Sequence, residues 1–246
     1  MVVNPEAVDI AGFSNPQIAE MPLHAVTEVL GSDGLVRRFG LEIARFSAEE
    51  KAQLNGALAW AMELHAEDKR FREPATNHIL RVAIRIMHHY GVSDVNLITA
   101  ALLHDSVEDH VYEITGRPDA SKDDALLEIS ARTNPDIAML VGAVTNPEYE
   151  KGRDKLEQYQ EHVDSILSKD DPRVRILKVS DFTDNAMGVL YMPAEGAEYR
   201  ARRYSVLVSI FEKAILDPST PLSSGARAHI VKQLAETQRR LNIFLK

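Results

Sequence analysis

Residues 97–109 form an apolar run that closes with four side chains able to ionise or bind metals: His104, Asp105, Glu108 and Asp109. In a helix, His104 and Glu108 would be one turn apart, and so would Asp105 and Asp109. Three carboxylates and an imidazole beside apolar residues are costly to bury unless a cation offsets their charge. The stretch therefore suggests a metal site. An acidic helix end that simply faces water explains this stretch alone about equally well.

Residues of ligand type also occur at the ends of apolar helical faces elsewhere. His78 begins a helix predicted over 78–90, and Asp181 ends the apolar face of another segment. A histidine at a helix start is more often a surface or capping residue. Taken together, however, His78, His104, Asp105 and Asp181 would form a four-ligand nitrogen and oxygen site. Such a site suits manganese, iron or zinc and leaves positions open for water.

Length and composition limit the classes of protein and of metal site. The 246 residues suffice for one large or two small domains, and 45% hydrophobic with 26% charged residues is typical of a soluble globular protein. The net charge of -9 argues against general nucleic-acid binding. Cysteine is absent, so any metal must be held by nitrogen and oxygen. No signal peptide is evident and the longest uncharged run has 11 residues, so we expect a cytoplasmic protein without a membrane span.

Apolar residues recur at helical spacing along most of the chain, and no strand-like alternation of useful length is found. Ser47 and Glu50 have the spacing of a capping box, Asn77 is a plausible N-cap, and Asp171-Pro172 can start a helix. The predicted helices cover about 48–66, 78–90, 95–111, 125–132, 136–145, 156–167, 197–216 and 224–244, with another after Pro172. We expect three parts: an N-terminal extension (1–45) with one or two short helices, a core (46–195), and C-terminal helices packed on it (196–246).

Four passages together resemble a known family. They are residues 70–78 with Arg70 and His78, residues 100–109 with the His-Asp and Glu-Asp pairs, residues 140–145, and residues 174–185. Over about 48–195 the chain resembles the HD-domain metal-dependent phosphohydrolases. More narrowly, it is similar to the hydrolase domain of bifunctional alarmone synthetase/hydrolases and to their small stand-alone relatives. The resemblance implies an all-α fold, the HD-domain helical bundle.

The resemblance also implies an activity. Those enzymes remove the 3′-pyrophosphate of guanosine tetraphosphate, and some relatives dephosphorylate NADPH. We therefore expect a phosphohydrolase that takes a small phosphorylated nucleotide and uses a divalent metal, Mn²⁺ first, to activate the attacking water. Two alternatives remain open: a phosphatase for another nucleotide, such as NADPH or a nucleoside monophosphate, and a nucleotide-binding module without turnover. The oligomeric state is also open.

Roles for individual residues follow from matching positions of the resemblance. It implies His78, His104, Asp105 and Asp181 as manganese ligands, Glu108 and Asp109 as the acidic pair that orients or deprotonates water, and Asn185 and Arg70 as substrate-binding residues. Nearby Arg72, Lys69 and Arg153 supply positive charge that can neutralise phosphates in an otherwise acidic chain.

Three positions depart from the family pattern. Ala75 stands where an aromatic residue is common, Phe182 where a basic residue is common, and Asp184 where His or Tyr is common. A carboxylate at 184 would repel a phosphate unless it points away from the substrate. The sequence thus indicates intact metal chemistry with altered substrate recognition.

Overall fold

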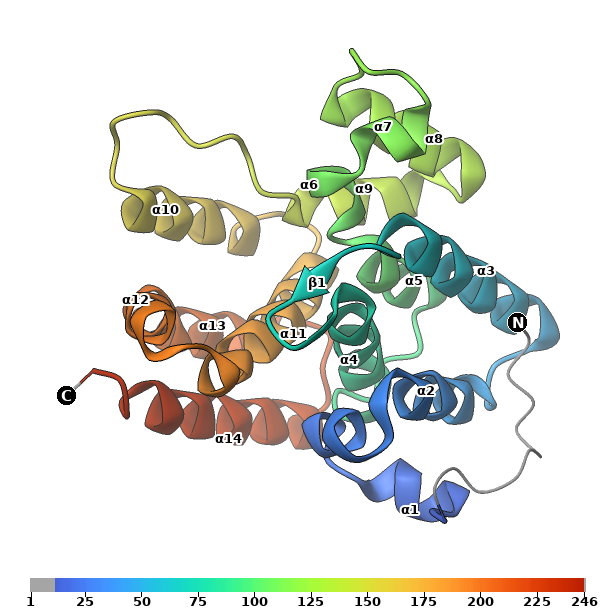
Figure 1. The fold of residues 1–246 in the computed structure, drawn as a ribbon, viewed down its shortest axis with the longest axis horizontal. Coiled ribbons are helices and arrows are strands. Elements are labelled where there is room, and N and C mark those ends of the chain that lie inside the picture. Colours follow the sequence, from blue (N-terminus) through green and yellow to red (C-terminus); the bar gives the residue numbers. More distant parts are fainter. Residues whose placement is uncertain (1–11, 246) are drawn as a thin grey trace.

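The computed structural model describes residues 12–245, and almost all of its regular structure is helical (Figure 1). The predicted all-α class is confirmed. The elements are α1 (Asn15–Glu20), α2 (Leu23–Ile43), α3 (Ala48–Leu64), β1 (Lys69–Arg70), β2 (Glu73–Pro74), α4 (Ala75–His88), α5 (Val95–Leu103), α6 (Ser106–Asp109), α7 (Val111–Thr115), α8 (Lys122–Arg132), α9 (Pro135–Val144), α10 (Lys155–Leu167), α11 (Arg173–Gly188), η1 (Val189–Tyr191), α12 (Ala194–Ser205), α13 (Val208–Leu216) and α14 (Ser224–Leu241).

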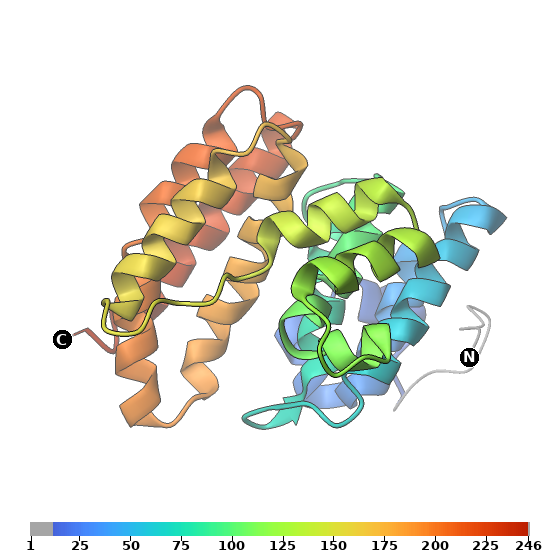
Figure 2. The same ribbon diagram turned by 90° about the horizontal axis from the view of Figure 1, so that it is seen from above.

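Helices α4, α5 and α11 form the centre of the molecule. Every residue of α4 from Thr76 to Met87 is buried, as is every residue of α5 from Leu97 to Leu103. Helix α11 packs against α4, α5 and α9 on one side and against α10, α13 and α14 on the other. In Figure 2, α10 and α12–α14 accordingly lie to one side and α2–α9 to the other. The central helices therefore place side chains from distant parts of the sequence in one interior.

The predicted capping box at the start of α3 is present. The Ser47 hydroxyl accepts a hydrogen bond from the Glu50 amide at 3.2 Å, and the Glu50 carboxylate accepts one from the Ser47 amide at 2.8 Å. These reciprocal bonds satisfy two donors that the first turn would otherwise leave unpaired. Local sequence alone decides this helix start.

The N-terminal segment is more ordered than its glycines and prolines predict. Helix α2 has 21 residues and is interrupted by a kink at Gly31, whose positive φ of 64° is non-helical and is readily adopted by glycine. Its buried face packs on α4. The prediction of one or two short helices thus underestimates the helical part of this segment: Gly31 interrupts α2 as its residue type predicts, but both parts of α2 are helical and have buried residues. Residues 1–11 lie outside the described part of the chain.

Three other boundaries differ from prediction. The helix expected over 95–111 is divided into α5, α6 and α7, since a tight turn at Asp105, with Glu108 N–H bonded to Asp105 O at 3.1 Å, ends α5. The helix expected over 197–216 breaks between α12 and α13. Asn77 lies inside α4 and donates to Glu73 at 3.2 Å, because Pro74 rather than Asn77 is the N-cap.

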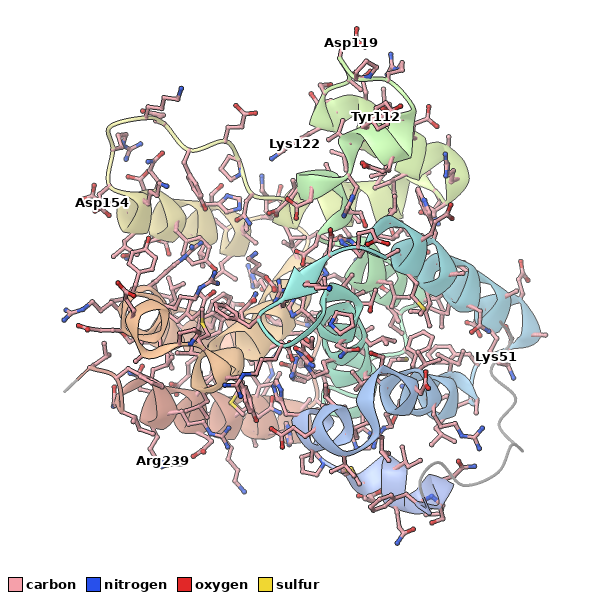
Figure 3. The ribbon with its side chains drawn as sticks, in the orientation of Figure 1. Lys51, Tyr112, Asp119, Lys122, Asp154 and Arg239 are labelled. Atoms are coloured by element: carbon pink, nitrogen blue, oxygen red, sulfur yellow. The ribbon has the colours of Figure 1, made fainter. Side chains whose placement is uncertain are left out.

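The surface is rich in charged side chains, as Figure 3 shows for Asp119 in the loop between α7 and α8 and for Lys122 at the start of α8. Lys122 donates to the backbone oxygen of Asn146 at 2.8 Å and so ties this region to the loop after α9. Among the described helices, none is both long and apolar enough to cross a membrane.

Arg173 joins the starts of α5, α9 and α11. It pairs with Asp94 before α5 at 3.2 Å, with Asp136 in α9 at 2.5 Å and with Asp171 before α11 at 2.6 Å. Hydrogen bonds from Arg173 hold the pKa values of Asp136 and Asp171 below their usual range. A carboxyl whose pKa is lower in the folded state stabilises the fold above its unfolded pKa, near 3.9, and loses that contribution as pH falls through the folded value.

We therefore expect Arg173→Met to lower the free energy of unfolding by about 1 kcal/mol at pH 7. The loss should shrink as pH falls below about 4, because the carboxyls become neutral in both proteins. Urea unfolding at pH 7 and pH 3 measures both. Arg202→Met is the matched control, since Arg202 forms a single surface pair with Glu198. An equal loss at both pH values would contradict the ionic role of Arg173.

Candidate metal centre and active site

Four side chains from three helical regions converge on one point in the interior. His78 projects from α4, His104 and Asp105 follow the end of α5, and Asp181 lies in the middle of α11. His78 Nε2 is 3.3 Å from His104 Nε2, 3.3 Å from Asp181 Oδ1 and 3.6 Å from Asp105 Oδ2. His104 Nε2 is 3.2 Å from Asp105 Oδ1 and 3.7 Å from Asp181 Oδ1. We call these four residues the four-ligand centre.

The separations fit a single bound ion. Ligand atoms bonded at about 2.1 Å to one ion lie about 3.0–3.5 Å apart, close to the distances here. The hydrogen bonds of the two imidazole rings also leave both Nε2 atoms free to bind an ion. His104 Nδ1 lies 2.8 Å from the backbone oxygen of Ala101, which can only accept, and His78 Nδ1 lies 2.8 Å from the Asp184 carboxylate. Each neutral ring then carries its proton on Nδ1, so two Nε2 lone pairs face each other, an arrangement that a cation stabilises.

The carboxylates of the four-ligand centre favour positive charge at this position. Burial acts to lower the pKa of His104, but the carboxylates of Asp105 and Asp181 raise it to about 9. Burial acts to raise the pKa of Asp181, yet the Lys178 ammonium, 3.0 Å away, and the two histidines hold it well below its usual value. The carboxylates are therefore charged at neutral pH. A bound divalent ion would compensate this negative charge. Without the ion, a proton on His104 compensates part of it.

Asp184 lies in α11, forms part of the wall of the cavity beside the four-ligand centre, and supports the metal centre. Besides the bond to His78, its buried carboxylate accepts hydrogen bonds from Arg81 at 2.9 Å and from Arg85 at 2.9 Å. Burial acts to raise its pKa, but Arg81, His78 and Arg85 keep it well below its usual value. The two arginines therefore offset the repulsion between a carboxylate at 184 and a phosphate. The carboxylate also fixes the ring of a predicted ligand.

We expect Asp184→Asn to weaken metal binding by roughly 10–100-fold, as is typical when the partner of a ligating histidine is changed. The amide keeps the shape but orients His78 less strongly and leaves Arg81 and Arg85 with less compensating charge. Titration of the folded variant with Mn²⁺ measures the change. Asp170→Asn is the control, since Asp170 is exposed in the loop before α11. Wild-type affinity in Asp184→Asn would remove this positioning role.

The acidic pair is split between two environments. Glu108 is half-buried, and its carboxylate accepts from the Asn146 backbone N–H at 2.7 Å and from the Asn146 side-chain amide at 2.9 Å. Burial and the neighbouring Asp105 raise its pKa above the ordinary value. Asp109 is exposed. Of the two, Glu108 has the fixed position and the proton affinity that a general base requires.

A cavity of about 460 Å³ lies beside the four-ligand centre, a size that suits a small-molecule site. Arg70 and Asn185 line it and link it to the predicted ligands. Arg70 donates to Asn185 at 2.8 Å and to Asp105 at 3.4 Å, while Asn185 donates to Asp181 at 2.5 Å. Of the residues predicted to bind substrate, Arg70 and Asn185 thus link the cavity to the predicted ligands.

Positive charge is concentrated along one part of this cavity. Lys69, Arg70 and Arg72 all line it, and all come from the short β1–β2 hairpin. Phe71, at the tip of the hairpin, is 61% exposed and has a φ of 36°, an unusual conformation for a bulky residue. Arg153 is elsewhere: it pairs with Glu161 at 2.7 Å and does not line this cavity.

Several lining residues were not expected from the sequence. They are His24, Thr27 and Glu28 from α2, Tyr191 from η1, and Arg200 from α12. No local motif marks them, because they reach the cavity only through the packing of α2 and α12 around α4 and α11.

The structure also explains Phe182, one of the departures from the family pattern. Phe182 is buried and stacks on Phe211 with ring centroids 4.4 Å apart, and it does not line the cavity.

The helical bundle and the His, His-Asp, Asp centre define a class, and comparison with known proteins agrees. A family model described as an HD domain matches residues 57–204, more than half of the chain. The chain belongs to the HD domain family. The predicted class of enzyme, an HD-domain hydrolase, is thereby confirmed. The family and the donor set together support a divalent metal as cofactor.

Individual relatives narrow the similarity. The chain is 28% identical over 201 residues to the guanosine-3′,5′-bis(diphosphate) 3′-pyrophosphohydrolase MESH1 of Homo sapiens, covering 80% of this chain and 93% of that protein. It is 36% identical over 135 residues to a guanosine-3′,5′-bis(diphosphate) 3′-pyrophosphohydrolase of Aquifex aeolicus, covering 54% of this chain and 17% of that protein. A solved structure, described as a metazoan ortholog of SpoT that hydrolyzes ppGpp, superposes with a TM-score of 0.59 at 21% identity, covering 80% of this chain and 98% of that one. The last similarity establishes the fold.

Proposed function

We propose that this protein is a guanosine-3′,5′-bis(diphosphate) 3′-pyrophosphohydrolase, or hydrolyses a closely similar nucleotide. The observation that carries the proposal is the four-ligand centre joined through Arg70 and Asn185 to a cavity with a cluster of positive side chains. The relatives with that activity support it, since they match up to 80% of the chain.

His78, His104, Asp105 and Asp181 would hold the metal, which we propose to be Mn²⁺. When bound, the ion would supply Lewis acidity toward water and phosphoryl oxygen. The two carboxylates suit Mn²⁺, and the two imidazoles make the donor set less suited to Mg²⁺ or Ca²⁺, which prefer oxygen ligands alone. Asp184 and the Ala101 carbonyl keep the two rings oriented toward the ion.

The other residues have separable tasks. Glu108, held by two hydrogen bonds from Asn146, accepts the proton of the attacking water. Arg70 balances the charge of the phosphate being released and couples it to Asp105. Lys69 and Arg72 add positive charge that draws an anionic nucleotide into an acidic protein. Asp109, being exposed, is suited to steering water rather than to deprotonating it.

The cavity also has surface for a nucleobase. Phe71 and Tyr191 line it, and aromatic rings stack on any base. These rings therefore provide a stacking surface without selecting one base. A phosphatase of another nucleotide, such as NADPH, remains the second candidate, because three positions of the family pattern differ here.

Product analysis tests the proposal. The Mn²⁺-loaded protein is incubated with guanosine tetraphosphate, NADPH and nucleoside monophosphates, and released pyrophosphate and orthophosphate are measured separately. We expect pyrophosphate from guanosine tetraphosphate. If orthophosphate is released from another nucleotide and no pyrophosphate is released from guanosine tetraphosphate, the assigned substrate would change and the metal mechanism would stand. Bound metal with no product from any nucleotide would favour a binding module.

Two wider features belong to the same proposal. We assign catalysis to residues 46–195, with residues 196–246 packed on that core; α2 from the segment before it contributes part of the cavity wall. A nucleotide substrate of this kind also makes the cytoplasm the expected compartment.

A further inference from the structure

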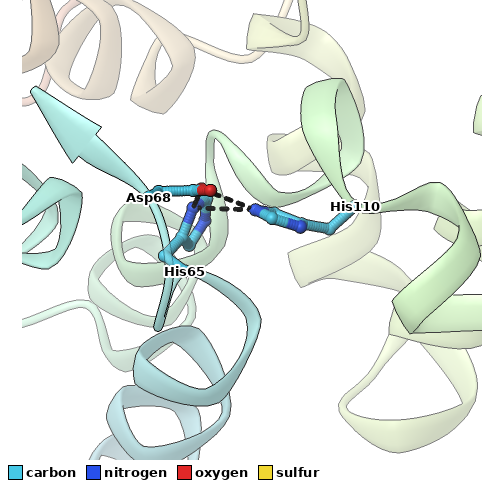
Figure 4. Close-up of side chains that lie close together, drawn as sticks. All are labelled: His65, Asp68 and His110. Carbon is cyan, nitrogen blue, oxygen red and sulfur yellow. Dashed lines mark hydrogen bonds and ion pairs between the residues drawn. The ribbon is translucent and has the colours of Figure 1, made fainter.

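A second cluster of side chains that could hold a metal ion shares no residue with the four-ligand centre. It is drawn in Figure 4. His65, Asp68 and His110 point toward one another, and the distances are short. Asp68 Oδ2 is 2.7 Å from His65 Nδ1 and 2.7 Å from His110 Nε2, and the two nitrogens are 3.1 Å apart. We call these three residues the outer histidine cluster.

Helix ends hold the three residues in place. His65 is the C-cap of α3, and the Asp68 backbone N–H bonds to the His65 carbonyl at 3.2 Å, so one tight turn carries two of the donors. His110 separates α6 from α7, and its N–H bonds to the Ser106 carbonyl at 3.0 Å. The side chains of His65 and His110 are 2% and 10% exposed. The site is thus preformed, and little conformational entropy would be lost on binding an ion.

Polar groups also lie near the far side of each ring. His65 Nε2 is 3.4 Å from the Ser106 hydroxyl, and His110 Nδ1 is 3.7 Å from the Glu113 carboxylate. His110 therefore faces a carboxylate at both nitrogens, while a neutral imidazole has one N–H to donate. A cation between His110 Nε2 and Asp68 removes the unfavourable contact, with the remaining proton directed at Glu113.

We propose that His65, Asp68 and His110 form a second binding site for a divalent transition-metal ion of the zinc type. Two imidazoles and one carboxylate with an open position for water are a frequent zinc set, whereas Ca²⁺ and Mg²⁺ prefer oxygen ligands. Around an ion bonded at about 2.0–2.1 Å the donors lie about 3.3 Å apart, so the three side chains need to spread by about half an ångström. The Asp68 side chain is 35% exposed, which leaves a route for the ion from solvent.

An ion at this position would brace the residues assigned to catalysis. His65 and Asp68 directly precede β1, which carries Lys69 and Arg70, and His110 follows α6, which carries Glu108. The ion would therefore join the phosphate-binding hairpin to the helix of the proposed base. This site stands on its own contacts, so it does not depend on which nucleotide the enzyme hydrolyses.

Metal counting tests the second site. The full chain is stripped of metal, dialysed against Zn²⁺ and analysed by elemental mass spectrometry. We expect two ions per wild-type chain, one in His110→Asn, one in Asp105→Ala and none in the double variant. His229→Asn, which removes an imidazole of α14 away from both clusters, should keep two. Co²⁺ in Asp105→Ala should give a visible absorption band that disappears in the double variant.

One ion per wild-type chain, unchanged in His110→Asn and lost in Asp105→Ala, would overturn the proposal. It would show that the outer histidine cluster is held by hydrogen bonds and a protonated imidazole alone. Asp68→Asn is the second variant if His110→Asn does not fold, because its side chain is the most exposed of the three. Retention of two ions in that variant would likewise exclude Asp68 as a ligand. Loss of the outer ion with nucleotide hydrolysis still measurable would separate this proposal from the proposed function.

Discussion

Asp105→Ala is expected to reduce nucleotide hydrolysis by at least about a thousandfold and to lower the metal content of the four-ligand centre. The carboxylate lies within 3.2–3.6 Å of the Nε2 atoms of both histidines, so its removal takes one of four donors and one negative charge from the site. Metal catalysis supplies several kcal/mol of transition-state stabilisation, and each 1.36 kcal/mol is a factor of ten in rate.

The measurements are turnover with saturating Mn²⁺ and metal per chain. The Asp105 side chain is 25% exposed, so the alanine variant should keep its fold, which circular dichroism and Tm can verify. Asp170→Ala, a change in an exposed loop, is the matched control and should retain both metal and rate. Unchanged turnover in Asp105→Ala would show that Asp105 is not a metal ligand needed for catalysis, and the assignment of the site would be wrong.

Glu108→Gln is expected to keep the metal and to lower kcat by about 10²–10⁴-fold, the usual contribution of a positioned general base. Glu108 is not among the four donors that converge on the ion. Its contacts are with Asn146, which fixes the carboxylate in one orientation. An amide oxygen can still accept one of these hydrogen bonds but cannot take a proton from water.

Rate and metal content must be measured together, because a loss of both would indicate a structural fault rather than a missing base. Glu67→Gln is the control, since Glu67 is an exposed residue of the same type. A kcat near the wild-type value would move the base role to Asp109, and Asp109→Asn would then be expected to show the large loss.

The break of the central helix at His104-Asp105 shows where sequence reasoning fails. The spacing of His104, Asp105 and Glu108 predicts one continuous helix, with the groups a turn apart on one face. In the structure α5 ends before His104, whose ring bonds back to the Ala101 carbonyl, and α6 begins again at Ser106. The ligands are therefore presented at a helix end, a geometry that the helical spacing of the sequence does not predict.

Asp184 and the outer histidine cluster show a second limit. The sequence identifies Asp184 only as a departure from a family pattern, and its partners Arg81 and Arg85 are about 100 residues away along the chain. His65 is marked in the sequence only as a helix end, and nothing connects it with His110. Contacts of this kind depend on how helices pack, and no local periodicity encodes them.

The sequence by itself determined the helical class, the residue types of the four-ligand centre and the family, because apolar periodicity, capping boxes and the spacing of His, His-Asp and Asp are local properties of the chain. Tertiary structure decided the direction in which Asp184 points, the contribution of α2 and α12 to the cavity, the placement of Arg153 outside it, and the assembly of His65, Asp68 and His110. Each of these results from packing between segments far apart in sequence, where burial of apolar faces fixes positions that the neighbouring residues leave open.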